Sequence, residues 1–124
     1  MPKKILIADD EPNIIKMVES RLQSQGYIVI AARDGEQALE KAKSEKPDLI
    51  ILDVMMPKLD GNEVCRRLRA SAECKNIPIV MLTACGQAAD IKKGMEGGAD
   101  SYVSKPFKSA TLLGIVSALA GPNE

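Results

Sequence analysis

Polar residues that could act together in chemistry stand where four apolar runs of the sequence end. Asp9 and Asp10 follow the first run, Asp53 ends the third, Thr83 follows the fourth and Lys105 follows the fifth. In an open parallel sheet, ligands bind beyond the carboxyl ends of the strands, near the point where the strand order reverses. If the apolar runs are strands of such a sheet, these five side chains meet at one edge.

Three carboxylates gathered at one edge favour a bound cation. At a separation of about 5 Å, each pair of ionised carboxylates repels by roughly 3 kcal/mol at an effective dielectric constant near 20. A hard divalent cation relieves this repulsion, and ligation by carboxylates, a backbone carbonyl and waters is typical of magnesium rather than zinc. The pattern therefore predicts a Mg²⁺ site at Asp9, Asp10 and Asp53, with Lys105 adding a further positive charge.

Each of these residues also has an ordinary structural explanation when it is considered alone. An acidic pair before a helix commonly caps the helix or lies in solvent, and an aspartate beside a loop commonly marks the end of a strand. Thr83 is compatible with a plain strand residue, and Lys105 with a surface lysine. The functional interpretation therefore depends on all of them occurring together at matching places.

Short apolar runs alternate with segments of helical periodicity five times, which is typical of a parallel sheet with helices on both faces. We predict one doubly wound α/β domain over residues 1–124, with five strands and five helices. Asp53 is expected to be exposed at its strand end, where a partner can reach it, while the buried run before it holds its backbone rigid. The expected strands are Lys4 to Ala8, Tyr27 to Ala31, Leu49 to Asp53, Ile77 to Leu82 and Ser101 to Ser104.

The expected helices follow from apolar residues at helical spacing and from proline and glycine at their ends. The segment from Ala88 to Met95 contains Gly94 and few large apolar residues, so it is expected to be the least firmly held helix. The five helices are expected from Glu11 to Gly26, from Asp34 to Ala42, from Asn62 to Ala70, from Ala88 to Met95 and from Ser109 to Ala120.

The composition argues against several classes of protein. Because 17 basic residues balance 17 acidic ones, the chain has no overall charge for binding nucleic acid or an anionic membrane. It has three cysteines without CxxC spacing and no histidine, which predicts neither a disulfide framework nor a zinc site and favours a reducing, cytoplasmic setting. The N-terminal apolar run is too short for a signal peptide or a membrane span.

Four stretches of the chain, taken jointly, resemble the receiver domain of two-component response regulators. They read ILIADDEP, IILDVMMPKLDG, PIVMLTA and GADSYVSKPF, and they stand in the order and at the spacing of that family. The resemblance covers essentially the whole chain. It implies a flavodoxin-like doubly wound domain whose five parallel strands have the order 2-1-3-4-5.

The resemblance also implies a role for each residue at the strand ends. Asp53 would be the phosphate acceptor, and Asp10 and Asp53 would ligate Mg²⁺ directly. Asp9 would act largely through a bound water, and the backbone carbonyl of Met55 would complete the protein ligands. Thr83 would donate a hydrogen bond to the phosphoryl group.

Three further positions carry roles that the resemblance implies. Lys105 would pair with the phosphoryl group, and Pro106 would follow a cis peptide bond that aims this lysine at the site. Tyr102 would change orientation together with Thr83, although a tyrosine on an edge strand often merely covers a neighbouring helix. The face formed by the fourth helix, fifth strand and fifth helix would change shape, and that change would be the output.

The implied function is a phosphorylation-dependent signalling switch. The chain contains no histidine, so a phosphohistidine donor must belong to another protein, such as a sensor histidine kinase or a phosphotransfer domain. The downstream partner would be a protein or a fused output domain, with no direct nucleic-acid contact from this domain. Whether phosphorylated copies dimerise stays open, as does whether the chain acts alone or within a larger regulator.

A third alternative is a phosphatase with an aspartate nucleophile on an α/β fold. Such enzymes carry a second acid two residues after the nucleophile, where this chain has Met55. A phosphatase turns over many substrate molecules, whereas a receiver promotes its own phosphorylation and loses the group slowly. We therefore rank the phosphatase far below the switch.

Overall fold

The computed structural model describes residues 2–84 and 98–121, in which five strands form a single parallel sheet. The strand order is β2-β1-β3-β4-β5, and every neighbouring pair is parallel. The predicted strand order and doubly wound fold are thus confirmed. The strands are β1 (Lys4–Ala8), β2 (Ile28–Ala32), β3 (Leu49–Asp53), β4 (Ile79–Ala84) and β5 (Ser101–Lys105).

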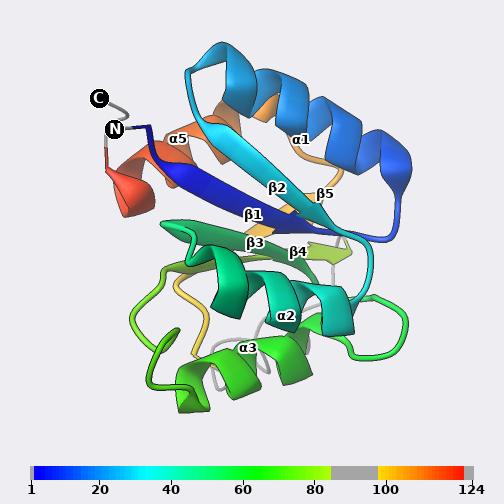
Figure 1. Cartoon of the computed structure of the whole chain (residues 1–124). Coiled ribbons are helices and arrows are strands. Elements are labelled where there is room, and N and C mark those ends of the chain that lie inside the picture. Colours follow the sequence, from blue (N-terminus) through cyan, green and yellow to red (C-terminus); the bar gives the residue numbers. More distant parts are fainter. Residues whose placement is uncertain (1, 85–97, 122–124) are drawn as a thin grey trace.

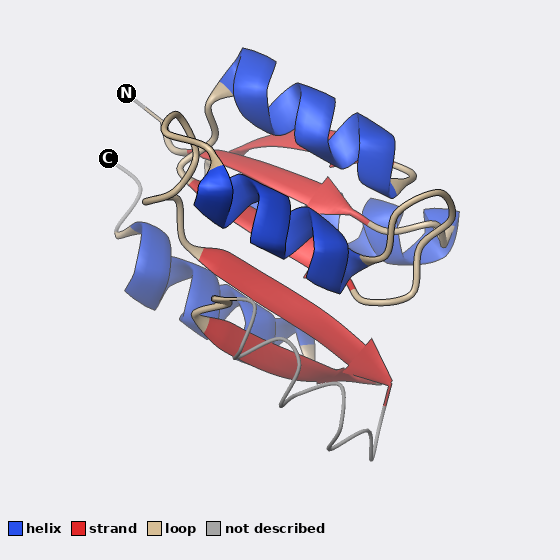
Figure 2. Ribbon diagram, turned by 90° about the horizontal axis from the view of Figure 1, so that it is seen from below, coloured by secondary structure: helices blue, strands red, loops and turns tan. Residues whose placement is uncertain are grey.

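Helices cover both faces of the sheet. Helices α1 and α5 lie on one face, and α2 and α3 lie on the other (Figures 1 and 2). The helix expected from Ala88 to Met95 lies outside the described residues. The described helices are α1 (Pro12–Ser24), α2 (Gly35–Glu45), α3 (Gly61–Ala70) and α5 (Ser109–Ala120).

Strand β3 is buried along its whole length because it lies between β1 and β4 and is covered on both faces. Successive side chains of a strand point to opposite faces. Ile50 and Leu52 therefore pack on the side of α2 and α3, whereas Leu49 and Ile51 pack on the side of α1 and α5. This double burial explains the uninterrupted apolar run before Asp53.

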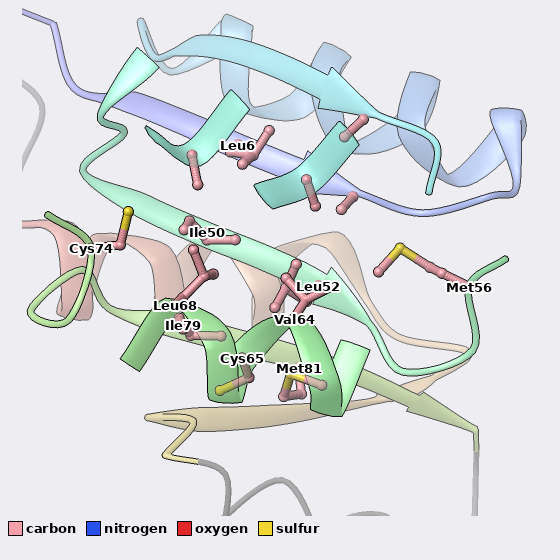
Figure 3. Close-up of a cluster of buried hydrophobic side chains, with 14 of the residues drawn as sticks. Leu6, Ile50, Leu52, Met56, Val64, Cys65, Leu68, Cys74, Ile79 and Met81 are labelled. Carbon is pink, nitrogen blue, oxygen red and sulfur yellow. The ribbon is translucent and has the colours of Figure 1, made fainter. Parts of the chain in front are cut away.

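The side chains divide into two hydrophobic clusters, one on each face of the sheet. Figure 3 shows the cluster between the sheet and α2 and α3, in which Val64 and Leu68 of α3 face Ile50 and Leu52 of β3. Each fully buried aliphatic side chain contributes about 1.5 to 3 kcal/mol of transfer free energy. The two clusters hold the central strands rigidly, and with them the strand ends that carry the polar residues.

Strands β4 and β5 extend further toward their carboxyl ends than the sequence predicts, and β2 does so by the single residue Ala32. Strand β4 begins at Ile79 instead of Ile77 and continues through Thr83, which pairs with Ser104. Strand β5 includes Lys105 as its last residue. The apolar pattern ends before the backbone pairing does, so a prediction from apolar residues places these ends too early.

None of the helices in the described part of the chain has the length and apolar character needed to cross a membrane.

Candidate functional site

The carboxyl end of β1 places one aspartate inside the protein and the next at the surface. The backbone N–H of Asp9 donates to the carbonyl of Ala32 at 3.1 Å, so the sheet pairing continues to this residue. The side chain of Asp9 is fully buried, and its Oδ1 accepts a hydrogen bond from the backbone N–H of Glu11 at 2.9 Å. Asp10 is exposed. The two neighbouring carboxylates therefore have very different surroundings.

Asp53 ends β3 and is buried, with 5% of its surface exposed. The expectation of an exposed acceptor was wrong, because the side chain lies beside Lys105 at the end of β5, Asp9 after β1 and the backbone of Met55 after β3. Its Oδ1 accepts a hydrogen bond from the backbone N–H of Met55 at 3.3 Å. Asp53 nevertheless belongs to the lining of an open cleft, formed by Asp10, Glu11, Ile14, Asp53, Met55, Lys105 and Pro106.

The Lys105 ammonium lies among three carboxylates. Its Nζ is 2.9 Å from Asp9 Oδ2, 3.2 Å from Glu11 Oε1 and 3.3 Å from Asp53 Oδ2. The predicted cis peptide bond between Lys105 and Pro106 is present. Lys105 thus connects the end of β5 with the ends of β1 and β3.

Glu11 is a site residue that the sequence analysis missed. It occupies the N-cap position of α1, but its side chain makes no capping hydrogen bond. Its carboxylate instead forms an ion pair with Lys105. A signal for this role was present, because glutamate is not a favoured N-cap residue and one placed directly before Pro12 indicates another use of the side chain.

Burial and neighbouring charges shift the pKa values of Asp53 and Lys105. The pKa of Asp53 is raised from 3.8 to about 7, first by burial and second by the neighbouring charge of Asp9, while Lys105 and the hydrogen bond from the Met55 backbone partly oppose these two effects. Burial by itself would lower the pKa of Lys105. The hydrogen bond to Asp9 and the charges of Asp53 and Asp9 outweigh burial, so the pKa of this lysine is raised. The site therefore stabilises added positive charge.

The residues present fit a hard divalent cation. One carboxylate oxygen from each of Asp9, Asp10, Glu11 and Asp53 lies within 4.8 Å of the others. An all-oxygen set of this kind suits Mg²⁺, which accepts carboxylates and keeps several waters. The pKa of Asp53 is raised first by burial and then by the charge of Asp9, and a bound cation would favour the ionised form of this carboxylate. Met55 borders the same cleft, and the residue is 69% exposed.

Thr83 and Tyr102 lie on the other face of the sheet from Lys105. Tyr102 pairs with Met81, and Thr83 pairs with Ser104; since residues paired across parallel strands share a face, both side chains lie on the side of α2 and α3. Among the described residues, neither hydroxyl has a hydrogen-bond partner, although both are buried. Burial and the neighbouring Cys65 raise the pKa of Tyr102 to about 12.

The structure thus brings together most of the predicted site residues. Asp9, Asp10, Asp53 and Lys105 converge, and Met55 and Pro106 border the cleft that they form. Thr83 and Tyr102 share the opposite face of the sheet. The expected output face includes β5 and α5, but its remaining element, the helix Ala88 to Met95, is outside the described residues.

Comparison with curated proteins shows relatives among transcriptional regulators. The alkaline phosphatase synthesis transcriptional regulatory protein PhoP of Bacillus subtilis (strain 168) is 49% identical over 124 residues, covering 100% of this chain and 51% of that protein. The chain spans about half the length of the curated relatives that it matches.

Solved structures of receiver domains share the fold along almost the whole chain. The receiver domain of sensor histidine kinase PA1611 from Pseudomonas aeruginosa PAO1 was solved with a magnesium ion coordinated in its active-site cleft. It has a TM-score of 0.90 and 34% identity, and the match covers 98% of this chain and 99% of that chain. The chemotaxis response regulator CheY4 of Vibrio cholerae has a TM-score of 0.90 and 37% identity, with 96% and 99% covered.

The family described as the response regulator receiver domain matches residues 5–117. With the acidic cleft, the strand order and the relatives in agreement, the chain belongs to the response regulator receiver domain family of two-component signalling.

Proposed function

We propose that Asp53 of this receiver domain accepts a phosphoryl group from a phosphohistidine of a partner protein. The observation that carries the proposal is the position of the Asp53 carboxylate. It borders an open cleft, 3.3 Å from the Lys105 ammonium and among three other carboxylates. Structural ion pairs do not require this concentration of like charge, whereas a cation-assisted phosphoryl transfer does.

The transfer exchanges one bond to phosphorus for another. An oxygen of the Asp53 carboxylate attacks phosphorus in line and forms the acyl phosphate, while the phosphorus–nitrogen bond of the donor breaks and its electron pair remains on the imidazole. The Lys105 ammonium moves onto the phosphoryl oxygens and offsets their charge. Since Lys105 is already within 3.3 Å of Asp53, the required displacement is small.

The proposed cation ligands are Asp10, Asp53 and the backbone carbonyl of Met55, with Asp9 acting through a water. Bound there, Mg²⁺ would supply electrostatic stabilisation of the charge on the transferring group. The buried Asp9 also forms an ion pair with Lys105 at 2.9 Å. Asp9 therefore orients the lysine as well as contributing negative charge to the site.

Thr83 and Tyr102 are the proposed switch. The Thr83 hydroxyl is buried and has no hydrogen-bond partner among the described residues, so a phosphoryl oxygen on Asp53 would give it an acceptor. Movement of Thr83 toward that oxygen would free space on the face it shares with Tyr102. Pro106 borders the cleft beside Lys105 and is assigned to the same response.

The proposed donor is a sensor histidine kinase or a histidine phosphotransfer domain, and the proposed output is binding to a downstream protein or a fused domain. One relative is named as a transcriptional regulator and another as a receiver domain of a histidine kinase. These names support the proposed output and the proposed donor, respectively. We assign residues 1–124 to one receiver unit in the cytoplasm, where the buried side chains of Cys65 and Cys74 remain thiols.

The domain is proposed to promote its own phosphorylation and to lose the group slowly, without multiple turnover. The phosphatase alternative is disfavoured because position 55, where a second acid is needed, carries an exposed methionine.

Intact-mass measurement after incubation with acetyl phosphate or phosphoramidate and Mg²⁺ tests the acceptor. The wild-type domain is expected to gain one phosphoryl group, and Asp53→Asn none. Asp60→Asn is the matched control, because Asp60 caps α3 and asparagine caps a helix equally well. A phosphoryl adduct that persists in Asp53→Asn would refute the assignment.

A further inference from the structure

Lys105 has three carboxylate partners, and one of them differs from the other two. The carboxylates of Asp9 and Asp53 are buried, whereas the Glu11 side chain is 59% exposed. Asp9 and Asp53 both belong to the proposed cation site and share their charge with a bound cation. Glu11 is not among the proposed ligands, so its charge remains available to Lys105.

The Glu11 carboxylate has no other evident use in the described part of the chain. It stands at the N-cap of α1 without capping the helix, and its only ion pair among the described residues is with Lys105. The backbone N–H of Glu11 donates to Asp9 Oδ1 at 2.9 Å. This hydrogen bond fixes the backbone of Glu11, so its side chain is held within reach of the Lys105 ammonium.

We infer that Glu11 is a positioning residue that competes with the incoming phosphoryl group for Lys105. The inference rests on the proposed function, in which Lys105 pairs with the phosphoryl oxygens. Phosphorylation adds about 1.5 to 2 negative charges at Asp53, and Lys105 must leave Glu11 in order to pair with them. Glu11 therefore sets how readily the phosphorylated arrangement forms.

Beryllofluoride binding measures this competition without turnover. Beryllofluoride coordinates an aspartate oxygen and stands in for the phosphoryl group. In ¹⁹F NMR titrations at saturating Mg²⁺, the Glu11→Gln variant is expected to bind beryllofluoride about two- to fivefold more tightly than wild type. This factor corresponds to the coupling typical of a partly exposed ion pair. Glu36→Gln is the matched control, since Glu36 is an exposed acid in the first turn of α2. The beryllofluoride affinity of this variant should equal that of wild type.

A second pair of variants separates competition from simple repulsion between Glu11 and the anion. Repulsion would raise the affinity of Glu11→Gln even without the lysine, whereas competition needs the ammonium. In the Lys105→Met background, Glu11→Gln is therefore expected to change the affinity by less than the error of the titration. Glu11→Asp, which keeps the charge on a shorter side chain, should lie between wild type and Glu11→Gln.

Two results would overturn the inference while leaving the proposed function intact. The first is equal beryllofluoride affinity of Glu11→Gln and wild type, and the second is a rise that persists in the Lys105→Met background. If the wild-type domain binds no beryllofluoride in the presence of Mg²⁺, the proposed function fails together with the inference.

Discussion

Gly61 lies directly against the backbone of Asp53. A Cβ atom at position 61 would stand 2.3 Å from the carbonyl oxygen of Asp53, and the N–H of Gly61 donates to the carbonyl of Val54 at 2.9 Å. The first residue of α3 thus packs onto the end of β3, where any side chain would displace the proposed acceptor. Only glycine permits this approach.

We expect Gly61→Ala to lower the free energy of unfolding by about 1 to 3 kcal/mol, because the added methyl group meets backbone that cannot move freely. Gly114→Ala in α5 is the control, since nothing lies within 4 Å of a Cβ placed there, and removing a helix glycine should stabilise by about 0.5 to 1 kcal/mol. Urea denaturation measures both variants. Equal stability of Gly61→Ala and wild type would contradict the described packing.

The raised pKa of Asp53 predicts a pH-dependent cost in the metal-free protein. The folded pKa of about 7 lies above the reference value of 3.8, so the cost is absent below about pH 4 and grows until about pH 7, after which it is constant. At about 1.4 kcal/mol per pKa unit, it reaches about 4 kcal/mol at most.

Asp53→Asn removes this ionisation, so its stability relative to wild type should increase between pH 4 and pH 8. Part of the gain is offset by the lost ion pair with Lys105. Chemical denaturation in the presence of a chelator, repeated across this range, measures the difference. Asp60→Asn, the same change at an exposed cap, should show a much smaller trend. A difference that shrinks as pH rises would show that Asp53 is not destabilised by ionisation.

Neutralising Asp10 should weaken Mg²⁺ binding by at least about tenfold, since even changes behind the direct ligands cost 10- to 100-fold. Calorimetry or NMR is the suitable measurement, because the chain contains no tryptophan for fluorescence. Asp60→Asn again controls for the loss of one negative charge. Unchanged affinity in Asp10→Asn would remove Asp10 from the set of ligands.

Arg69 joins α3 to two segments that are distant in sequence. Its guanidinium donates to the carbonyls of Lys75, Ile77 and Gly98, at 3.0, 2.6 and 2.8 Å, and to the Asp100 carboxylate at 2.6 Å. The carboxylate of Asp100 also accepts from the N–H that begins β4. One side chain therefore holds the segments that lead into β4 and β5.

Arg69→Met should lower the free energy of unfolding by about 2 kcal/mol or more, because carbonyls and a carboxylate lose their donor together. Arg66→Met is the matched control: Arg66 stands one turn earlier, is 70% exposed and pairs only with Glu63 among the described residues. Its effect should stay within about 0.5 kcal/mol. Similar losses in the two variants would argue against a special role for Arg69.

The fold was predictable because burial on both faces leaves a plain pattern in the sequence. The run before Asp53 and the apolar spacing of the helices are sufficient to predict a parallel sheet between two helical layers. The ends of β4 and β5 were less predictable, because Thr83 and Lys105 remain paired in the sheet although they are polar. These two side chains are polar because they serve the site, whereas the hydrogen-bonded pairing of their backbones does not depend on the polarity of the side chain.

The site was predictable in its residue types but not in its geometry. Strand ends identified Asp9, Asp10, Asp53 and Lys105, since parallel strands bring these ends to one edge. The burial of Asp53 was not evident from the sequence, because it depends on how residues at the ends of three separate strands pack around it. The pairing of Glu11 with Lys105 joins residues 94 positions apart, which local pattern does not reveal.

Asp53 is the residue proposed to carry the phosphoryl group, and chemical trapping can locate that group on the chain. Borohydride reduces an aspartyl phosphate to homoserine, so the modified residue can be located by peptide mass spectrometry after treatment with acetyl phosphate and Mg²⁺. Homoserine is expected at position 53 and at no other aspartate. Homoserine at another position, or its absence from position 53 in protein that carries the phosphoryl mass, would show that Asp53 is not the acceptor.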